Sequence, residues 1–140
     1  MKKNNQQGQK PQDEEIVWQP VSRLREIGEI IDKAVKDAEN QELLLMEGTY
    51  SPHLFSDATI WGIKKVHTEK LAFIDIYLEQ IKRWKKEITS REDHFELIHL
   101  TEQCKKLKVL VTSILVLADE IGRKTSNRVM NMDDAEQGLK

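Results

Sequence analysis

The segment from residue 91 to residue 121 repeats apolar residues at alternating spacings of three and four without interruption. Its repeating positions, called the seam below, are Leu97, Leu100, Cys104, Leu107, Val111, Ile114, Ala118 and Ile121. This spacing places all of these side chains on one stripe of an α-helix, as in coiled coils and helical bundles. We therefore predict a helix over residues 91–122. Ser90 and Asp93 form its capping signal, and Gly122 is its expected end.

A second apolar stripe of the same kind precedes it and predicts a helix over residues 21–47. Its members are Leu24, Ile27, Ile31, Ala34, Ala38 and Leu45, with Gln41 as the polar exception. Ser22 is the expected N-cap of this helix. Gly48 follows it, where a glycine in the left-handed conformation often ends a helix.

The segment between these two helices predicts a third helix over residues 52–88. Its stripe contains Ile60, Ile63, Ile74, Tyr77, Ile81, Trp84 and Ile88, and two polar residues, His67 and Lys70, share the register. The sequence offers two starting points, at Ser51-Pro52 and at Ser56-Asp57, and does not choose between them.

The connection at Thr89-Ser90 is short, so the last two helices should fold back on one another as a hairpin. The fold class expected is all-α: an elongated antiparallel three-helix bundle with coiled-coil-like packing that associates into a larger bundle. The helical domain should cover residues 16–124. We expect a disordered polar tail at residues 1–15 and a mobile acidic tail at residues 125–140, because neither can bury much apolar surface.

The last helix carries more apolar residues than one seam can bury. Val109, Leu110, Val116 and Leu117 lie off the seam, so that the helix is apolar all round between residues 109 and 118. A helix of this kind is normally buried on every side. These four residues therefore predict an interface with a second copy or with another helical protein. Trp18 is a further interface candidate, since aromatic anchors are common at binding hot spots. Its alternative role is to staple the N-terminal segment to the bundle together with Ile16 and Val17, and the sequence does not separate the two roles.

The sequence contains few residues arranged for catalysis. Glu96 and His99 form one Glu-x-x-His pair, whereas di-iron bundles need two such pairs and two further carboxylates. Cys104 lies on the seam, where a cysteine acts as a small apolar residue. His67 is expected as a hydrogen-bonded interior or boundary residue. We therefore predict no enzyme, no cofactor, no bound metal and no small-molecule ligand.

One basic cluster surrounds Trp84 and consists of Lys82, Arg83, Lys85 and Lys86. Such a cluster can contact nucleic acid. However, Trp84 lies on the apolar stripe and should point inward, and the chain has a net charge of −2. Nucleic-acid binding is therefore the first alternative, and a metal-binding bundle enzyme is the second.

The expected function is that of a non-catalytic interaction or scaffold protein, acting through self-association and a partner surface. The expected location is the cytoplasm, because the chain has a single cysteine and its first ten residues form no apolar signal region. The longest apolar run, residues 109–118, is much shorter than the roughly 20 residues of a membrane span.

Overall fold

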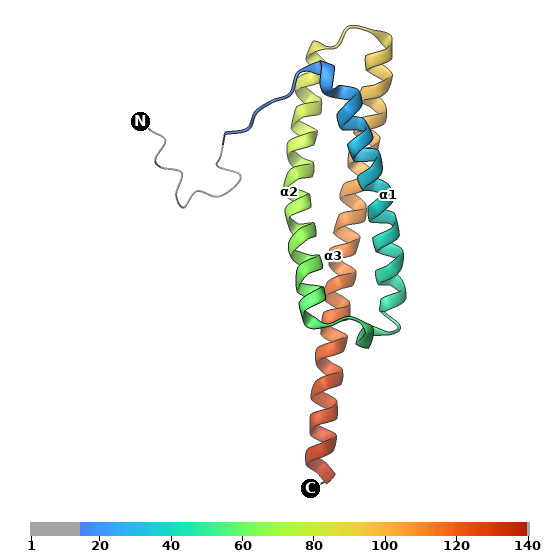
Figure 1. Ribbon diagram of the computed structural model, residues 1–140, viewed down its shortest axis with the longest axis vertical. Helices are drawn as coiled ribbons and strands as arrows, with labels where there is room; N and C mark the ends of the chain where they lie inside the picture. Colours follow the sequence, from blue (N-terminus) through green and yellow to red (C-terminus); the bar gives the residue numbers. More distant parts are fainter. Residues whose placement is uncertain (1–14, 140) are drawn as a thin grey trace, which may run out of the picture.

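The three expected helices form an up-down-up bundle along one long axis (Figure 1). The computed structural model describes residues 15–139, and side chains are described over residues 15–125. The helices are α1 (Leu24–Gly48), α2 (Asp57–Glu87) and α3 (Arg91–Leu139). Within these residues there is no strand, so the prediction of an all-α three-helix bundle is confirmed. The tail predicted at residues 1–15 falls almost entirely outside the described residues.

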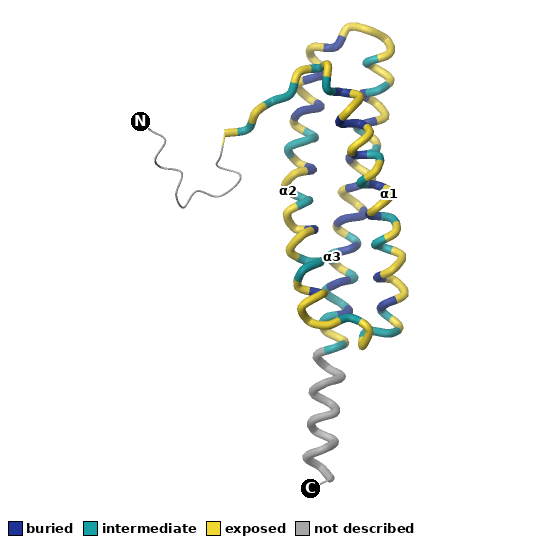
Figure 2. The backbone as a smooth tube through the Cα atoms, viewed as in Figure 1, coloured by how far each residue is buried: buried dark blue, intermediate teal, exposed yellow. Residues whose placement is uncertain are grey.

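Helix α3 is the common partner of the other two helices. Both α1 and α2 pack along it, whereas their backbones rarely approach one another (Figure 1). Every seam residue of α3, from Leu97 to Ile121, is buried, and the buried positions of all three helices face the axis of the bundle (Figure 2). The seam that predicts the helix is therefore also the centre of the core.

Exposed ion pairs along both flanks of α3 show how the helices are aligned. On one flank, Glu39 of α1 lies 2.9 Å from Lys106. On the other, Lys64 of α2 lies 2.9 Å from Asp119. Further pairs on these flanks are Arg25–Glu96, Asp32–His99 and Asp75–Lys108. Exposed pairs contribute only about 0–1 kcal/mol each, so they accompany the apolar packing rather than cause it.

Helix α2 begins at the second of its two expected starts. Ser56 has an extended backbone, and its Oγ accepts a hydrogen bond from the Thr59 N–H at 3.1 Å. Pro52 instead begins the short 3-10 helix η4 (Pro52–Leu54). The predicted boundary at residue 52 was thus wrong. The intervening residues let Phe55 fold over the end of the bundle, where it packs against the core.

The expected cap of α3 is confirmed, whereas that of α1 is not. Ser90 Oγ accepts a hydrogen bond from the Asp93 N–H at 3.0 Å. Ser22, by contrast, lies inside the 3-10 helix η3 (Val21–Arg23), which leads directly into α1. Pro20 is the cap residue there, and no side chain makes a capping bond. Instead, the 3-10 turn provides a backbone hydrogen bond at the start of the helix, from the Arg23 N–H to the Pro20 carbonyl.

The predicted end of α3 at Gly122 was wrong, because the helix continues to Leu139. A Cβ atom at Gly122 would lie 3.5 Å from Ile60, an ordinary packing distance. This glycine therefore sits against α2 inside a continuous helix. The bundle itself ends close by, where the Lys124 side chain donates a hydrogen bond to the Thr49 carbonyl. The predicted mobile tail begins within this helix, and its side chains after Thr125 lie outside the described ones.

Gly48 is required for close packing rather than for a left-handed backbone. It is the last residue of α1, and Thr49 after it is also in the right-handed helical conformation. A Cβ atom at Gly48 would collide with the Phe55 ring and would lie 3.2 Å from the Ile121 side chain. Gly62 of α2 differs, because a Cβ atom there would meet nothing within 4 Å.

The two glycines should therefore respond oppositely to alanine. Gly62→Ala should raise the free energy of unfolding by about 1 kcal/mol, since alanine restricts the unfolded chain and favours the helix. Gly48→Ala should lower it by about 1–3 kcal/mol, because Phe55 or Ile121 must move. Urea denaturation of both variants beside the parent chain measures this. A stabilised Gly48→Ala variant would contradict the close packing at this end of the bundle.

Candidate functional site

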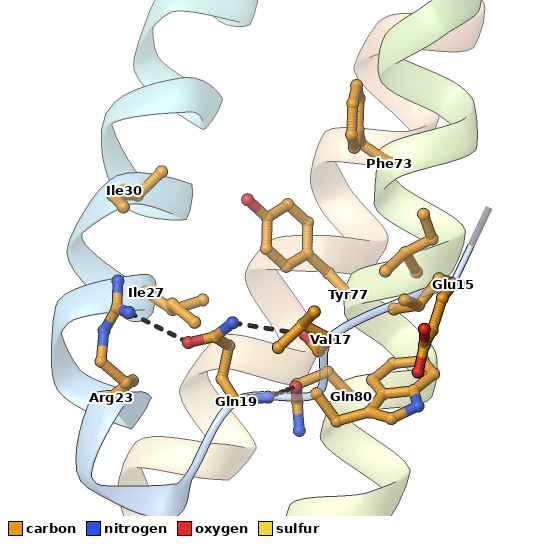
Figure 3. A pocket seen from close by; sticks show the side chains of 12 residues that line it. Glu15, Val17, Gln19, Arg23, Ile27, Ile30, Phe73, Tyr77 and Gln80 are labelled. Carbon is orange, nitrogen blue, oxygen red and sulfur yellow. Dashed lines mark hydrogen bonds between the residues drawn. The ribbon is translucent and has the colours of Figure 1, made fainter. Parts of the chain in front are cut away.

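An apolar groove runs between α1 and α2, whose backbones both lie close to α3 and rarely approach one another. Its volume is about 430 Å³. Ile27 and Ile30 line it from α1, and Phe73 and Tyr77 line it from α2. Figure 3 shows the Tyr77 ring reaching from α2 toward α1. Ile30 and Phe73 are 49% and 60% exposed, so no residue described in this chain fully covers them.

The residues just before α1 cross one end of this groove and are fastened to α2. The Gln19 N–H donates to the Gln80 side-chain oxygen at 2.6 Å (Figure 3). The indole N–H of Trp84 donates to the Gln19 carbonyl at 2.9 Å. Trp84 is fully buried, so this bond also satisfies a polar group that would otherwise be costly to bury.

Trp18 belongs to this fastening. Its ring stacks against the Arg83 guanidinium, with the central guanidinium carbon 4.1 Å from the ring centroid. Contacts of this kind are favourable by about 0.5–1 kcal/mol at exposed sites. Of its predicted roles, a staple for the N-terminal segment is the one that these contacts support. Val17 beside it is exposed and also lines the groove.

The four off-seam residues of α3 do not form one surface. Leu110 is only 7% exposed, and its position places it on the side of α3 that faces α1. Gln103, two turns earlier on the same side, donates a hydrogen bond to Asp32 of α1. Leu117 is half-buried and packs against the core. The expectation that Leu110 needs a cover from outside the chain was therefore wrong, because it is already buried in the single chain, whereas Leu117 keeps part of its surface exposed.

Val109 and Val116 do remain exposed, at 69% and 60%, and they belong to a longer row. We define the outer stripe of α3 as seven exposed positions spaced alternately by three and four: Phe95, Ile98, Glu102, Lys105, Val109, Thr112 and Val116. Phe95 and Ile98 are 64% and 58% exposed. The stripe lies on the side of α3 opposite the seam. Sequence reasoning missed it because the two central charged residues interrupt its apolar pattern.

The basic cluster lies at the end of α2 nearest the turn to α3. As predicted, Trp84 points inward, and Lys82, Arg83, Lys85 and Lys86 are exposed around it. Arg83 contacts Trp18 and lies 3.7 Å from Glu79. Among the residues that the structure describes, the three lysines form no ion pair. Their positive charge is therefore available to solvent.

Glu96 and His99 do not converge on a common point. His99 Nε2 lies 2.9 Å from an Asp32 oxygen of α1. Glu96 instead faces Arg25, 3.7 Å away. Each residue thus contributes to an ion pair on the α1 flank. No group of three or more metal-ligating side chains occurs among the described residues.

Two titratable groups are buried in the core. Burial raises the pKa of the Cys104 thiol to about 11, which keeps it protonated and unreactive at neutral pH. His67 donates a hydrogen bond from Nδ1 to the Ile63 carbonyl, 2.9 Å away. Burial, opposed by this hydrogen bond and assisted by the nearby charge of Lys70, lowers the pKa of His67. At neutral pH both groups are therefore uncharged, and both are packed inside the bundle.

Comparison with models of protein families, with curated proteins and with solved structures finds no match for this chain. None of the helices in the described part combines the length and the apolar character needed to cross a membrane.

The lowered pKa of His67 predicts how stability depends on pH. The unfolded chain takes up a proton near pH 6.5 and the folded chain only at lower pH, so acidification below about 6.5 favours unfolding. The loss cannot exceed about 1.4 kcal/mol per pH unit, the limit for one proton. Urea denaturation between pH 7.5 and 5.5 should show a smaller loss for His67→Leu. His53→Gln, at an exposed histidine, should behave like the parent chain, and equal slopes for all three proteins would contradict the assignment.

Proposed function

We propose that this chain is a non-catalytic helical interaction protein of the cytoplasm, acting through self-association and through a surface for a helical partner. The observation that carries the proposal is the distribution of its exposed apolar residues. Among the described residues, half of the exposed large apolar side chains lie in two places, the groove between α1 and α2 and the outer stripe of α3, and the other half lie between residues 43 and 66. Large exposed apolar surfaces in soluble proteins commonly mark interaction sites.

The groove supports this proposal through its shape. In a four-helix bundle each helix packs against two neighbouring helices. Here α1 and α2 each pack mainly against one helix, α3. The position between them, opposite α3, is therefore open to one more helix. Ile30 and Phe73 would lie beneath such a helix. A helix that inserts its apolar face into a groove is a common mode of protein recognition.

The contacts of the candidate catalytic residues agree with a structural role for each. His99 is paired with Asp32, Glu96 faces Arg25, and Cys104 is buried within the seam. In each case the polar or reactive atom is directed at a neighbouring helix or at the core. This arrangement stabilises the bundle without requiring a substrate.

Self-association makes a direct prediction about mass in solution. Light scattering coupled to gel filtration, repeated at protein concentrations from about 1 to 100 μM, should give a mass that rises from one chain toward two. The reason is that pairing removes apolar side chains from water. A mass of one chain over the whole range would contradict self-association and would leave only the partner surface.

The exposed lysines of the basic cluster favour a second candidate, the binding of nucleic acid. A gel shift at 50 and 200 mM salt tests it, since phosphate contacts weaken steeply as salt rises. If this candidate is correct, the parent chain shifts nucleic acid at low salt, and a variant with Lys82, Lys85 and Lys86 changed to alanine does not. A matched variant with Lys33 and Lys36 of α1 changed to alanine should keep the shift. No shift at low salt eliminates this candidate.

A further inference from the structure

We propose that two copies of this chain pair through the outer stripe of α3, with the two helices antiparallel and Glu102 of each copy opposite Lys105 of the other. This inference rests on the self-association proposed above and assigns it a surface and a direction. The partner that covers the stripe is a second copy of the chain.

Charge complementarity within the stripe selects this arrangement. Both Glu102 and Lys105 are exposed, and neither forms an ion pair within the described part of the chain. In an antiparallel pair whose centre lies between these two positions, Glu102 of each copy lies opposite Lys105 of the other. The pair therefore contains two contacts between opposite charges. A parallel pair would instead place Glu102 opposite Glu102 and Lys105 opposite Lys105. Like charges in direct opposition destabilise a helical pair, so the antiparallel direction is favoured.

An antiparallel pair centred between residues 102 and 105 also brings apolar residues of the two stripes together. Six of the seven stripe positions, from Phe95 to Thr112, are symmetric about the midpoint between residues 102 and 105. Val116 is the exception, because the position that matches it is Arg91. Ile98 of one copy therefore lies opposite Val109 of the other, and Phe95 lies opposite Thr112. Phe95, Ile98 and Val109 are more than half exposed in the single chain, and the pairing would cover them on both copies. Positions spaced alternately by three and four, like these six, form the seam that antiparallel coiled coils use.

The outer stripe suits a second copy better than the groove does. Residues 15–19 of the same chain already cross one end of the groove, where Gln19 is hydrogen-bonded to Gln80. The outer stripe has no such cover within the described residues. It is also self-complementary, as the interface of a two-fold symmetric dimer must be.

Sedimentation equilibrium of the full chain tests the stripe through its charges. Glu102→Lys and Lys105→Glu, made singly, each replace two attractive contacts of the dimer by two repulsive ones. Each should weaken the dimer by roughly tenfold. The double variant exchanges the charges, restores opposite signs across the antiparallel pair and should return the dissociation constant to within about threefold of the parent value. Glu29→Lys on the exposed face of α1 is the matched control and should leave it unchanged.

Val109→Glu tests the apolar part of the stripe and should weaken the dimer by at least about a hundredfold, because it places a charge against Ile98 of the second copy. Leu43→Glu, at an exposed leucine of α1, is its control. Circular dichroism of every variant shows whether the helices are intact.

The outcomes separate this inference from the proposed function. Weakening by the single charge variants together with rescue by the double variant supports the antiparallel pair. Weakening without rescue overturns the direction of pairing. A dimer that ignores every α3 substitution overturns the stripe as the interface but leaves self-association standing. A parent chain that stays monomeric overturns both.

Discussion

The burial of one stripe of α3 beneath two other helices is the interaction on which the whole fold depends. Its members include Leu100, Ile114 and Ile121, which are almost completely inaccessible to solvent. Full burial of such a side chain contributes about 1.5–3 kcal/mol. Because the backbones of α1 and α2 rarely approach one another, while both pack along α3, each buries its apolar stripe mainly with the help of α3. The two ends of the bundle, including the positions of Gly48 and Phe55, follow from how these helices lie on that stripe.

This dependence on one central helix explains why apolar surface remains outside the core. Two helices placed on the flanks of α3 leave a groove between themselves and leave the far side of α3 uncovered. Polar contacts then occupy the margins, as with Asp32, which contacts both His99 and Gln103 across the α1 flank. Trp84 contributes to both the apolar core and the polar contacts at its margin. Its ring is buried in the core, and its N–H donates a hydrogen bond to the segment that leads into α1.

The seam and the outer stripe of α3 differ in composition, and each composition suits a different kind of contact. The seam is wholly apolar, so its packing is strong and is formed within one chain. The outer stripe keeps the same spacing but places Glu102 and Lys105 at its centre. Charged residues on an exposed stripe reduce unspecific association, and they distinguish between directions of pairing. A stripe of this composition is consistent with pairing that is weaker and more selective than the packing of the core.

The amino-acid sequence by itself determined the three helices, the turn at Thr89-Ser90, the Ser90 cap and the members of the seam. These features depend on local signals and on periodic spacing along the chain. Only the tertiary structure decided where α2 begins, why Gly48 must be a glycine, and that Leu110 is covered while Val109 is not. The same holds for the groove beside Phe73. These features depend on distances between segments remote in sequence, which periodicity does not contain. The excess of apolar residues on α3 was readable from the sequence, but its division into covered and exposed sides required the position of α1.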